Sequence, residues 1–512
     1  MREAERLRDA GAGSEARRLC EQVLRAHPDD AAALNLLAAL AADEANFAEG
    51  ARWAQRAIEL EPRSAAAHYT LGRLLQAEGR LAEAEAAYGR SLELEPRQAR
   101  AHNNLGCVLH MQGKLEPAIA SYRAALQLDP ALPQANQNLA SITRDRGALE
   151  QAVAGYRRQT AANPADAEAW NNLGNVYREL GLHREAIASF AEAIARNPGL
   201  AEARYSRSFE LLLCGDYLEG WKEYEWRWKV KAASAARREF RQPLWDGREL
   251  PAGTLLLHAE QGFGDTLQFA RYAAPAARRC RAVVLECQPE LASLLGSVAG
   301  LSRVVPQGAA LPPFDAQLPL MSLPRVFGTT LESVPWEGAY VRADPARARR
   351  WDEVLLPGAR RHVGLAWAGR PQQWDDRKRS ITLATLAPLA AAPGIAFYSL
   401  QKGEAAAQAA APPPGLRLTD SAARIEDFAD TAALMSRLDL VITIDTSVAH
   451  LAGAMGVPVW VLVAHAPDWR YHLEREDNPW YPSMRLFRQQ TDGDWSGPIG
   501  RAAAELAQLA AQ

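Results

Sequence analysis

Residues 97–130, RQARAHNNLGCVLHMQGKLEPAIASYRAALQLDP, are one unit of a 34-residue repeat that decides the fold of the N-terminal half. Each unit has two helical stretches. The first carries a leucine beside a small residue, and the second carries an alanine followed four residues later by an aromatic ring. Small residues that face rings allow two helices to pack closely, so the pattern predicts helical hairpins. One hairpin cannot bury its apolar face alone, and we therefore expect the hairpins to stack.

The same positions recur in phase over about residues 31–200. A proline closes each unit: Pro28, Pro62, Pro96, Pro130, Pro164 and Pro198. The leucine and small residue are Leu71–Gly72, Leu105–Gly106, Leu139–Ala140 and Leu173–Gly174. A glycine is expected to end each first helix, because the chain there turns left-handed. These glycines are Gly79, Gly113, Gly147, Gly181 and Gly215. The pattern resembles the tetratricopeptide repeat (TPR) family, and the resemblance implies a superhelix whose concave face is available for a partner.

Three asparagines on the expected first helices, Asn104, Asn138 and Asn172, are also 34 residues apart. Each side-chain amide offers a donor and an acceptor, so a ladder of them would hold the backbone of an extended peptide. TPR units of the eukaryotic O-linked N-acetylglucosamine transferase carry a similar ladder, and this resemblance implies a polypeptide guest. The alternative is that these are ordinary polar residues on a solvated face.

Length and charge restrict the class of protein. A chain of 512 residues is too long for a single core, so two or more domains are expected. The net charge of −3 creates no field that would attract polyanions, which argues against nucleic acid as a partner. Five scattered cysteines predict neither a zinc site nor a disulfide framework. The chain shows no signal peptide and no apolar stretch long enough for a transmembrane segment, so we expect a cytoplasmic protein.

A cluster of tryptophans follows the last repeat. Trp221, Trp226 and Trp228 lie at helical spacing, and we expect them to form a cap over the open end of the superhelix. Stacking of these rings on a sugar is the alternative. A basic and turn-rich stretch comes next and marks the domain junction.

Beyond that junction, short aliphatic runs alternate with alanine-rich helical patterns, which predicts parallel sheets. The expected strands are Thr254–His258, Ala282–Glu286, His362–Ala366, Ile395–Leu400, Leu440–Asp445 and Val457–Leu462. The fold class is therefore α + α/β multidomain, an all-α superhelix followed by two Rossmann-like α/β lobes. The expected domains are 1–235 for the superhelix and its cap, 236–345 for the first lobe and 346–512 for the second.

The turn at residues 258–267, HAEQGFGDTL, joins the first strand of the first lobe to a helix. Gly262 and Gly264 allow a close approach of the backbone to a ligand. The carboxylate of Asp265 follows the carboxyl end of a strand, where ligands of open α/β sheets bind. The alternative role for Asp265 is to complement the dipole of its own helix.

A second turn lies in residues 441–458, VITIDTSVAHLAGAMGVP. A buried strand runs into Asp445, Thr446 and Ser447, and a helix starts there. Unpaired backbone N–H groups and two hydroxyls would face one point, which favours a diphosphate. His450, one turn inside the helix, is placed to add a donor.

These two turns resemble glycosyltransferase family 9, which includes the heptosyltransferases. The family carries Asp-Thr-Gly-x-x-His in its donor lobe, and Asp445, Thr446 and His450 match this signature while Ser447 replaces the glycine. The Gly-Asp pair at 264–265 matches the family's first lobe. The resemblance implies a GT-B type pair of Rossmann-like lobes and inverting transfer from a nucleoside-diphosphate sugar to an acceptor hydroxyl, with the aspartate of that pair as catalytic base.

Further donor-binding residues are expected in the second lobe. The family places an acidic residue for the nucleoside after the middle strand, and Lys402 and Glu404 lie there. The cations Arg377, Lys378 and Arg379 would neutralise the leaving diphosphate. No clustered oxygen ligands accompany these motifs, so we expect a metal-independent enzyme whose only co-substrate is the nucleotide sugar and which has no cofactor.

Three stretches together, GWKEYEWRW at 220–228, LHAEQG at 257–262 and FADT at 428–431, resemble a group of bacterial TPR proteins with a family-9-like C-terminal domain whose acceptor is generally unassigned. With the TPR half, this predicts a glycosyltransferase that recruits a protein acceptor or partner. The alternative function is a TPR scaffold whose transferase-like domain is degenerate or senses nucleotide sugars. A third is epimerisation of a nucleotide sugar in the same fold.

Overall fold

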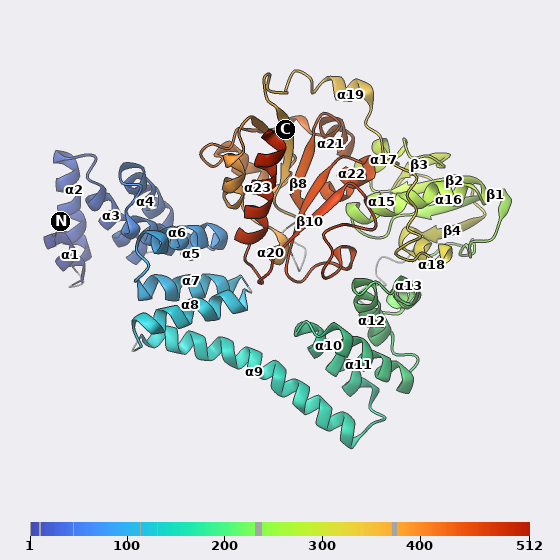
Figure 1. Ribbon diagram of the computed structural model, residues 1–512, viewed down its shortest axis with the longest axis horizontal. Helices are drawn as coiled ribbons and strands as arrows, with labels where there is room; N and C mark the ends of the chain where they lie inside the picture. The colour runs from blue at the N-terminus through green and yellow to red at the C-terminus, as the bar shows by residue number, and fades with distance from the viewer. Residues whose placement is uncertain are drawn as a thin grey trace. The chain divides into compact units, whose positions relative to one another are not determined.

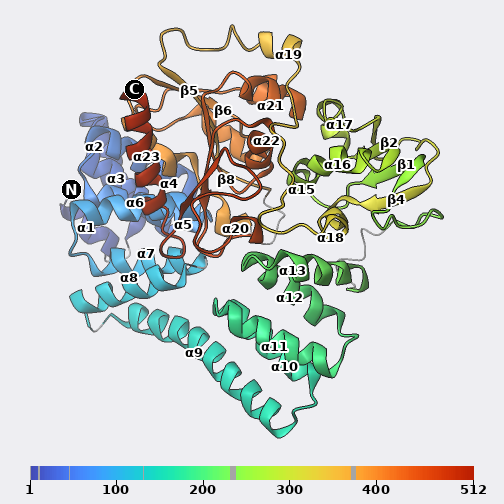
Figure 2. The same cartoon turned by 45° about the vertical axis from the view of Figure 1, so that its right-hand side comes forward.

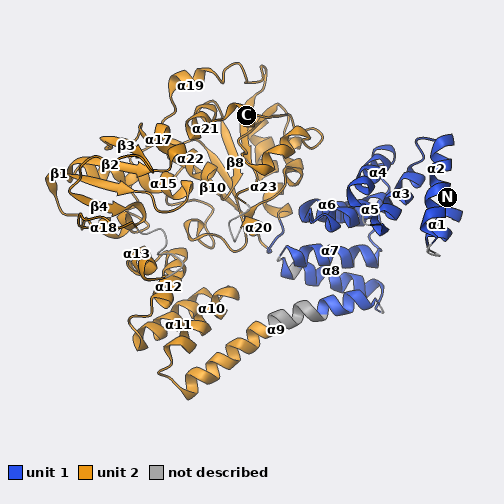
Figure 3. Cartoon of the chain, turned by 180° about the vertical axis from the view of Figure 1, so that it is seen from behind, with its two compact units in different colours: residues 1–147, 491–494 blue, residues 148–490, 495–512 orange. Residues whose placement is uncertain are grey.

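The computed structural model describes residues 2–9, 12–44, 46–112, 114–130, 132–230, 238–370 and 376–511 (Figure 1). Gly113 and the predicted boundary at 235/236 lie outside the described residues, as do the side chains of 140–146 and of Arg377. The chain divides into two compact units, Met1–Gly147 with Thr491–Asp494, and Ala148–Gln490 with Trp495–Gln512 (Figure 3).

The first unit contains the helical hairpins that the repeat predicts. Its helices are α1 (Arg2–Asp9), α2 (Gly13–Ala26), α3 (Ala31–Asp43), α4 (Phe47–Leu60), α5 (Ala65–Ala77), α6 (Leu81–Leu94), α7 (Ala99–Met111) and α8 (Leu115–Leu128). A Cβ at Gly72 would lie 2.8 Å from the Tyr88 ring, and a Cβ at Gly106 would lie 2.6 Å from the Tyr122 ring. The predicted packing of small residues against rings is therefore confirmed.

The predicted turn at Gly147 is wrong. One helix, α9 (Pro133–Ala162), runs through this position for 30 residues. The glycines at 79, 181 and 215 do have positive φ and end their helices as predicted. In those units a residue other than alanine follows the glycine and caps the next helix, whereas Ala148 follows Gly147. Alanine is the strongest helix former, which favours a continuous helix at this position.

The second unit begins with the C-terminal part of α9 and two further hairpins. These are α10 (Ala167–Glu179) with α11 (His183–Arg196), and α12 (Ala201–Leu213) with α13 (Tyr217–Tyr224). The predicted cap follows as the end of α13 and a 3-10 turn, η1 (Glu225–Lys229). Trp221 is 1% exposed and lies edge-on to Phe269 and Trp469, so it belongs to a core. Cations cover Trp226 and Trp228, with Arg204 over the former and Arg227 over the latter. Trp221 thus packs in a core that the hairpin shares with the lobes, and the cap over the end of the superhelix stays a prediction.

The first lobe is a four-stranded parallel sheet with the order β3-β2-β1-β4. Its strands are β1 (Leu250–His258), β2 (Cys280–Cys287), β3 (Arg303–Pro306) and β4 (Ala316–Pro319). The helices α15 (Phe263–Phe269), α16 (Ala273–Ala277) and α17 (Pro289–Leu295) lie on one side of this sheet (Figure 2). Leu255 and Leu257 point into the core on that side, while Leu256 packs against Phe240 and Phe314 on the other.

The second lobe is a six-stranded parallel sheet with the order β10-β9-β8-β5-β6-β7. Its strands are β5 (Arg361–Ala366), β6 (Ile395–Ser399), β7 (Leu418–Thr419), β8 (Leu440–Ile444), β9 (Val459–Val463) and β10 (Met484–Arg488). Its helices and turns are α19 (Pro345–Arg349), α20 (Asp376–Arg379), η4 (Leu383–Ala391), η5 (Glu404–Ala410), α21 (Phe428–Met435), α22 (Ser447–Met455), η7 (Trp469–Tyr471) and α23 (Ser496–Ala511).

The predicted fold class is confirmed: TPR hairpins precede two Rossmann-like lobes with parallel sheets. The six predicted strands are present within two residues at their C-terminal ends. The other four, β3, β4, β7 and β10, were not predicted. Within the described ranges, each helix is too short or too polar to cross a membrane.

Candidate functional site

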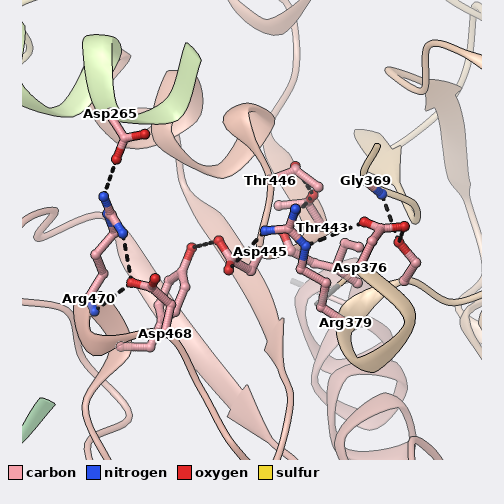
Figure 4. A network of polar contacts seen from close by, with 12 residues as sticks. Asp265, Gly369, Asp376, Arg379, Thr443, Asp445, Thr446, Asp468 and Arg470 are labelled. Atoms are coloured by element: carbon pink, nitrogen blue, oxygen red, sulfur yellow. Dashed lines mark hydrogen bonds and ion pairs between the residues drawn. The ribbon is translucent and has the colours of Figure 1, made fainter. Parts of the chain in front are cut away.

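In the second lobe the strand order reverses between β5 and β8, and the carboxyl ends of these two strands are here called the crevice of the lobe. After β5 the chain builds β6 and β7 on one side, and it then returns to build β8 and β9 on the other. Ligands of such sheets bind at the carboxyl ends of the two strands that flank the reversal. Asp445 follows β8 and Gly369 follows β5 shortly after its end. Arg379 Nη1 lies 3.3 Å from Asp445 Oδ2 and so spans this crevice (Figure 4).

The helix α22 begins directly beside Asp445. Thr446 is its N-cap, and the Thr446 hydroxyl accepts the N–H of Val448 at 3.3 Å. None of the hydrogen bonds among the described residues uses the backbone N–H groups of Thr446 or Ser447. These two N–H groups therefore remain available to an anion at the positive end of the helix dipole.

Asp265 lies in the first turn of α15, where its alternative role at the N-terminus of its own helix is visible. Its Oδ2 accepts the N–H of Gly262 at 2.9 Å, which caps the helix, and its Oδ1 contacts Arg470 Nη2. Burial raises the pKa of the Asp265 carboxyl, although Arg470 acts in the opposite direction. A carboxylate has about four lone-pair sites, so both oxygens can accept a further hydrogen bond.

The two predicted turns face each other across the lobes. A Cβ on Gly264 would lie 2.7 Å from His450 Cδ2, so only glycine fits between α15 and α22 at this point. His450 is 5% exposed, and its Nδ1 is 3.1 Å from the Tyr481 hydroxyl. Burial lowers the pKa of His450 well below its usual range, and the neighbouring Arg470 lowers it further. The imidazole is therefore neutral.

Arg470 is the residue of this site that the sequence analysis missed. Its guanidinium contacts Asp265, lies 2.8 Å from Asp468 Oδ1 and donates to Gln268 Oε1 at 2.7 Å (Figure 4). The next residue, Tyr471, donates its hydroxyl to Asp445 Oδ1 at 2.8 Å. The signal was present: these polar residues follow β9, a strand that was predicted, and the carboxyl ends of parallel strands share one edge.

The pKa of Asp445 is also shifted by its surroundings. Burial raises the pKa of the Asp445 carboxyl and the nearby Asp468 raises it further, while Arg379 opposes both. Two acidic side chains, Asp265 and Asp445, are thus held in one network by Arg470, Asp468 and Tyr471 (Figure 4). Such opposed perturbations are typical of functional sites, although structural ion pairs also produce them.

The remaining predicted donor residues lie outside this network. Lys402 donates from Nζ to the carbonyls of Ala422 at 2.8 Å and Ile425 at 2.7 Å. Glu404 is exposed at the start of η5, beyond the carboxyl end of β6. Lys378 is exposed in α20. Among the described residues, no cluster of three or more histidine, cysteine, aspartate or glutamate side chains would hold a metal ion.

The first lobe also reverses its strand order, between β1 and β4. A side chain from the TPR half occupies this second crevice. Arg227 of η1 is 1% exposed and forms a fork onto Glu260, with Nη2 2.9 Å from Oε1 and Nε 3.1 Å from Oε2. Its Nη2 also donates to Ser322 Oγ at 2.9 Å. Glu260 follows β1 and Ser322 follows β4, so the arginine joins the two strand ends.

The predicted asparagine ladder is split between the two units. Asn104 and Asn138 belong to the first, and Asn172 is exposed on α10 in the second. Asn104 Nδ2 donates to the Tyr69 hydroxyl at 3.1 Å, and Asn138 Nδ2 donates to Asn103 Oδ1 at 3.1 Å. Asn104 Oδ1 in turn accepts the Nδ2 of Asn103 at 3.2 Å, so Asn104 is bonded within the groove through both ends of its amide. A cavity of about 320 Å³ adjoins Asn104 alone of the three, and its lining consists of Arg73, Gln76, Ala77, Asn104 and Met111.

Comparison with known proteins identifies the repeats. Tetratricopeptide repeat models match residues 69–133, 140–181 and 167–200. Protein FlbA of Caulobacter vibrioides is 28% identical over 355 residues, which are 60% of this chain and 55% of FlbA. The chain thus spans about half the length of this curated relative.

Two solved structures of TPR proteins are similar to part of this chain. YrrB, described as a TPR protein with an unusual peptide-binding site, is 20% identical, and the match covers 37% of this chain and 97% of YrrB with a TM-score of 0.24. A TPR protein of Thermus thermophilus is 21% identical, and that match covers 41% of this chain and 97% of the other with a TM-score of 0.24. The N-terminal half of the chain therefore consists of TPRs, and an α/β region follows it.

Proposed function

We propose that the α/β half is a glycosyltransferase that moves a sugar from a nucleoside-diphosphate sugar to an acceptor hydroxyl with inversion and without a metal. The observation that supports this best is the juxtaposition of the Asp265 turn with the start of α22 across the two lobes, where Gly264 touches His450. One turn offers a carboxylate, and the other offers free N–H groups. An acid–base group opposite an anion site is what displacement at an anomeric carbon requires.

The proposed step uses the side chains as follows. Asp265 takes the proton of the acceptor hydroxyl while that oxygen bonds to the anomeric carbon. The bond from this carbon to the diphosphate oxygen breaks, and its electron pair leaves with the nucleoside diphosphate. The N–H groups of Thr446 and Ser447, with Arg379, stabilise the charge that develops there. Neutral His450 supplies a donor to the same group.

The TPR half would recruit a protein acceptor or partner. Its first helices α5 and α7, which line the cavity beside Asn104, contain no aspartate or glutamate, whereas Arg73 lies on α5 and Arg100 on α7. The acidic residues of that region lie on the second helix α6 and on α3, where Asp43 Oδ1 is 3.3 Å from Arg73 Nη2. A basic and polar groove favours an extended segment with carboxylate side chains, because unlike charges steer the encounter.

The substitution Asp265→Asn tests the proposed base. Asparagine keeps an oxygen for the N–H of Gly262, so the helix cap survives while the proton acceptor is lost. Transfer should be abolished and donor binding retained. Binding is measured as thermal shift with UDP-, GDP-, ADP- and dTDP-sugars, since a ligand at a hundred times its Kd adds about 2.7 kcal/mol to stability. Asp344→Asn, at the cap of α19, is the matched control. Near-normal turnover in Asp265→Asn would disprove the assignment.

A second candidate function is a scaffold whose lobes bind a sugar nucleotide without turning it over. The engagement of both Asp265 oxygens, by Gly262 and by Arg470, favours it. The two functions differ in one measurement. A transferase hydrolyses its donor slowly in the absence of acceptor, whereas a scaffold shows donor binding in the thermal-shift panel and no release of nucleoside diphosphate.

A further inference from the structure

The last TPR hairpin, Ala201–Lys229, contacts the candidate site through both lobes. On the first lobe, Arg227 holds Glu260, which lies five residues before Asp265 on the same loop. Glu260 Oε1 also accepts the N–H of Met321 at 3.2 Å. The loop that leads into α15 is therefore fixed at its start by a cation from the TPR half.

On the second lobe, the contact is His472, which is two residues after Arg470. It is the one non-glycine residue with positive φ, +55°, among the described residues. Its Nδ1 is 3.1 Å from the carbonyl of Leu213, and its Nε2 is 3.1 Å from the Tyr217 hydroxyl. A histidine in this conformation is uncommon and needs its surroundings to hold it. Both partners belong to the last TPR hairpin.

The direction of these hydrogen bonds follows from the groups involved. A carbonyl only accepts, so His472 Nδ1 carries the proton and donates to Leu213. Burial lowers the pKa of His472, which leaves its Nε2 as an acceptor for the Tyr217 hydroxyl. Trp480 Nε1 in turn donates to the Tyr217 oxygen at 2.8 Å. The Tyr217 hydroxyl thus donates to His472 Nε2 and accepts from Trp480 Nε1. Loss of this hydroxyl leaves both ring nitrogens without a hydrogen-bond partner.

The turn around His472 presents its side chains to two partners. Trp469 and His472 face the hairpin, where Trp469 meets Trp221 and His472 stacks on Tyr217. Arg470 faces the carboxylates. Beneath the turn, buried Arg488 donates to the carbonyls of Tyr471, His472 and Arg475. Arg488 therefore fixes the backbone of the turn, and the hairpin fixes the side chain of His472.

We infer that the last TPR hairpin positions the candidate site. Tyr217 fixes the position of the turn that places Arg470 against Asp265. Arg227 fixes the start of the loop that leads into α15, the helix of Asp265. Tyr217 is thus a positioning residue that acts through Arg470. Its relevance to catalysis rests on the proposed function, whereas the geometric claim is testable without turnover.

The test is amide hydrogen exchange of the full chain. Tyr217→Phe should accelerate exchange in the turn at 468–474 and in the first turn of α15 by about tenfold, because two buried polar groups lose their partner. Tyr177→Phe is the matched control: it also removes a buried tyrosine hydroxyl from a TPR hairpin, one that accepts a hydrogen bond from Arg157. It should leave both segments unchanged. If exchange at α15 is unchanged in Tyr217→Phe, the inference is wrong.

A double variant separates positioning through Arg470 from a general loss of packing. Arg470→Gln should itself accelerate exchange at the start of α15, and adding Tyr217→Phe should then add little there. A full additional effect would overturn the proposed route. If Tyr217→Phe does not fold, His472→Asn replaces it, since asparagine tolerates positive φ and lacks the ring nitrogen that Tyr217 contacts. If none of the four sugar nucleotides binds the native chain, the proposed function fails while the exchange pattern still decides this inference.

Discussion

In the first lobe the strand order reverses between β1 and β4, and in the second lobe between β5 and β8, so each lobe has a crevice at the carboxyl ends of two neighbouring strands. An arginine lies in both. Arg227 in the first is 1% exposed and comes from the TPR half, whereas Arg379 in the second comes from a short helix of the lobe and its side chain is 16% exposed. A side chain from the TPR half lies in one crevice. Beside the other lie Arg379, which pairs with Asp445, and two N–H groups that no hydrogen bond among the described residues uses.

The difference shows that topology offers a place for a ligand without deciding what occupies it. In the first crevice, the acidic partner of the arginine is fully buried and both of its oxygens are used by the guanidinium fork. In the second, Asp445 shares its oxygens between Arg379 and Tyr471, and α22 begins beside it. A nucleotide sugar is therefore expected in the second lobe only. Four experiments test this contrast.

The largest effect is expected in the crevice of the first lobe. Arg227→Met should lower the free energy of unfolding by about 3–5 kcal/mol, because it leaves the Glu260 carboxylate buried without its cation. Tryptophan fluorescence during denaturation reports this, since only Trp53 and Trp170 precede residue 200. Arg278→Met removes an exposed pair with Glu337 and should cost less than about 1 kcal/mol. An equal loss of unfolding free energy in Arg227→Met and Arg278→Met would contradict the proposed difference between the two crevices.

The second effect concerns turnover in the crevice of the second lobe. Arg379→Gln should slow transfer by about a hundredfold or more, because one charge-stabilising donor for the leaving diphosphate is lost. Its cost in stability should be smaller than that of Arg227→Met, since the pair with Asp445 is partly solvated. Lys378→Gln removes the neighbouring exposed cation and serves as the control. If the arginine variant turns over as fast as the lysine variant, Arg379 has no role at the diphosphate.

The third prediction concerns pH. Burial raises the pKa of Asp265, while Arg470 opposes that rise and Asp468 adds to it. A base must be ionised, so turnover should be lost as the pH falls through the raised pKa, above the range of an ordinary aspartate. Arg470→Gln removes the lowering influence, and the acid limb of the profile should move to higher pH. A limb that stays in place, or moves to lower pH, would show that another group titrates there.

The smallest expected effect lies at the edge of the crevice of the second lobe. Glu404→Gln should weaken donor binding by about 1 kcal/mol, the contribution of one hydrogen bond from a ribose hydroxyl to an exposed carboxylate. Isothermal calorimetry with the donor that gives the largest thermal shift measures it. Glu474→Gln, at another exposed glutamate, should leave the Kd unchanged. Equal affinity in both variants would remove Glu404 from the donor site.

The sequence predicted the fold well wherever a pattern is repeated or buried. Prolines at a fixed interval located the TPR hairpins, and runs such as Leu440–Ile444 located the central strands. The strands that were not predicted are short, such as Leu418–Thr419, or carry charged residues, such as Met484–Arg488. The turn expected at Gly147 was wrong because the glycine alone was used as the signal, and the alanine after it favours a continuous helix.

The candidate site was predictable in part. Asp265, Asp445, Thr446 and His450 lie in motifs that are contiguous in sequence, and the structure brings them together. Arg227 carries no local pattern, and Arg470 shows only its place after the predicted strand β9. Arg227 reaches the first lobe from the TPR half, and Arg470 reaches Asp265 from the other lobe. Such partners are selected by tertiary contact, so a single sequence offers no spacing that would identify them.

The last hairpin is bonded to both lobes, so it is less free than the other repeats to be gained or lost in evolution. Units that precede α12 contact mainly their neighbours, as repeats of a solenoid do, so a gene can gain or lose 34-codon segments there and change which proteins it captures. The hairpin that supplies Tyr217 and Arg227 has no such freedom. A lineage that shuffled the lobes onto another binding partner would have to carry this one hairpin along with them.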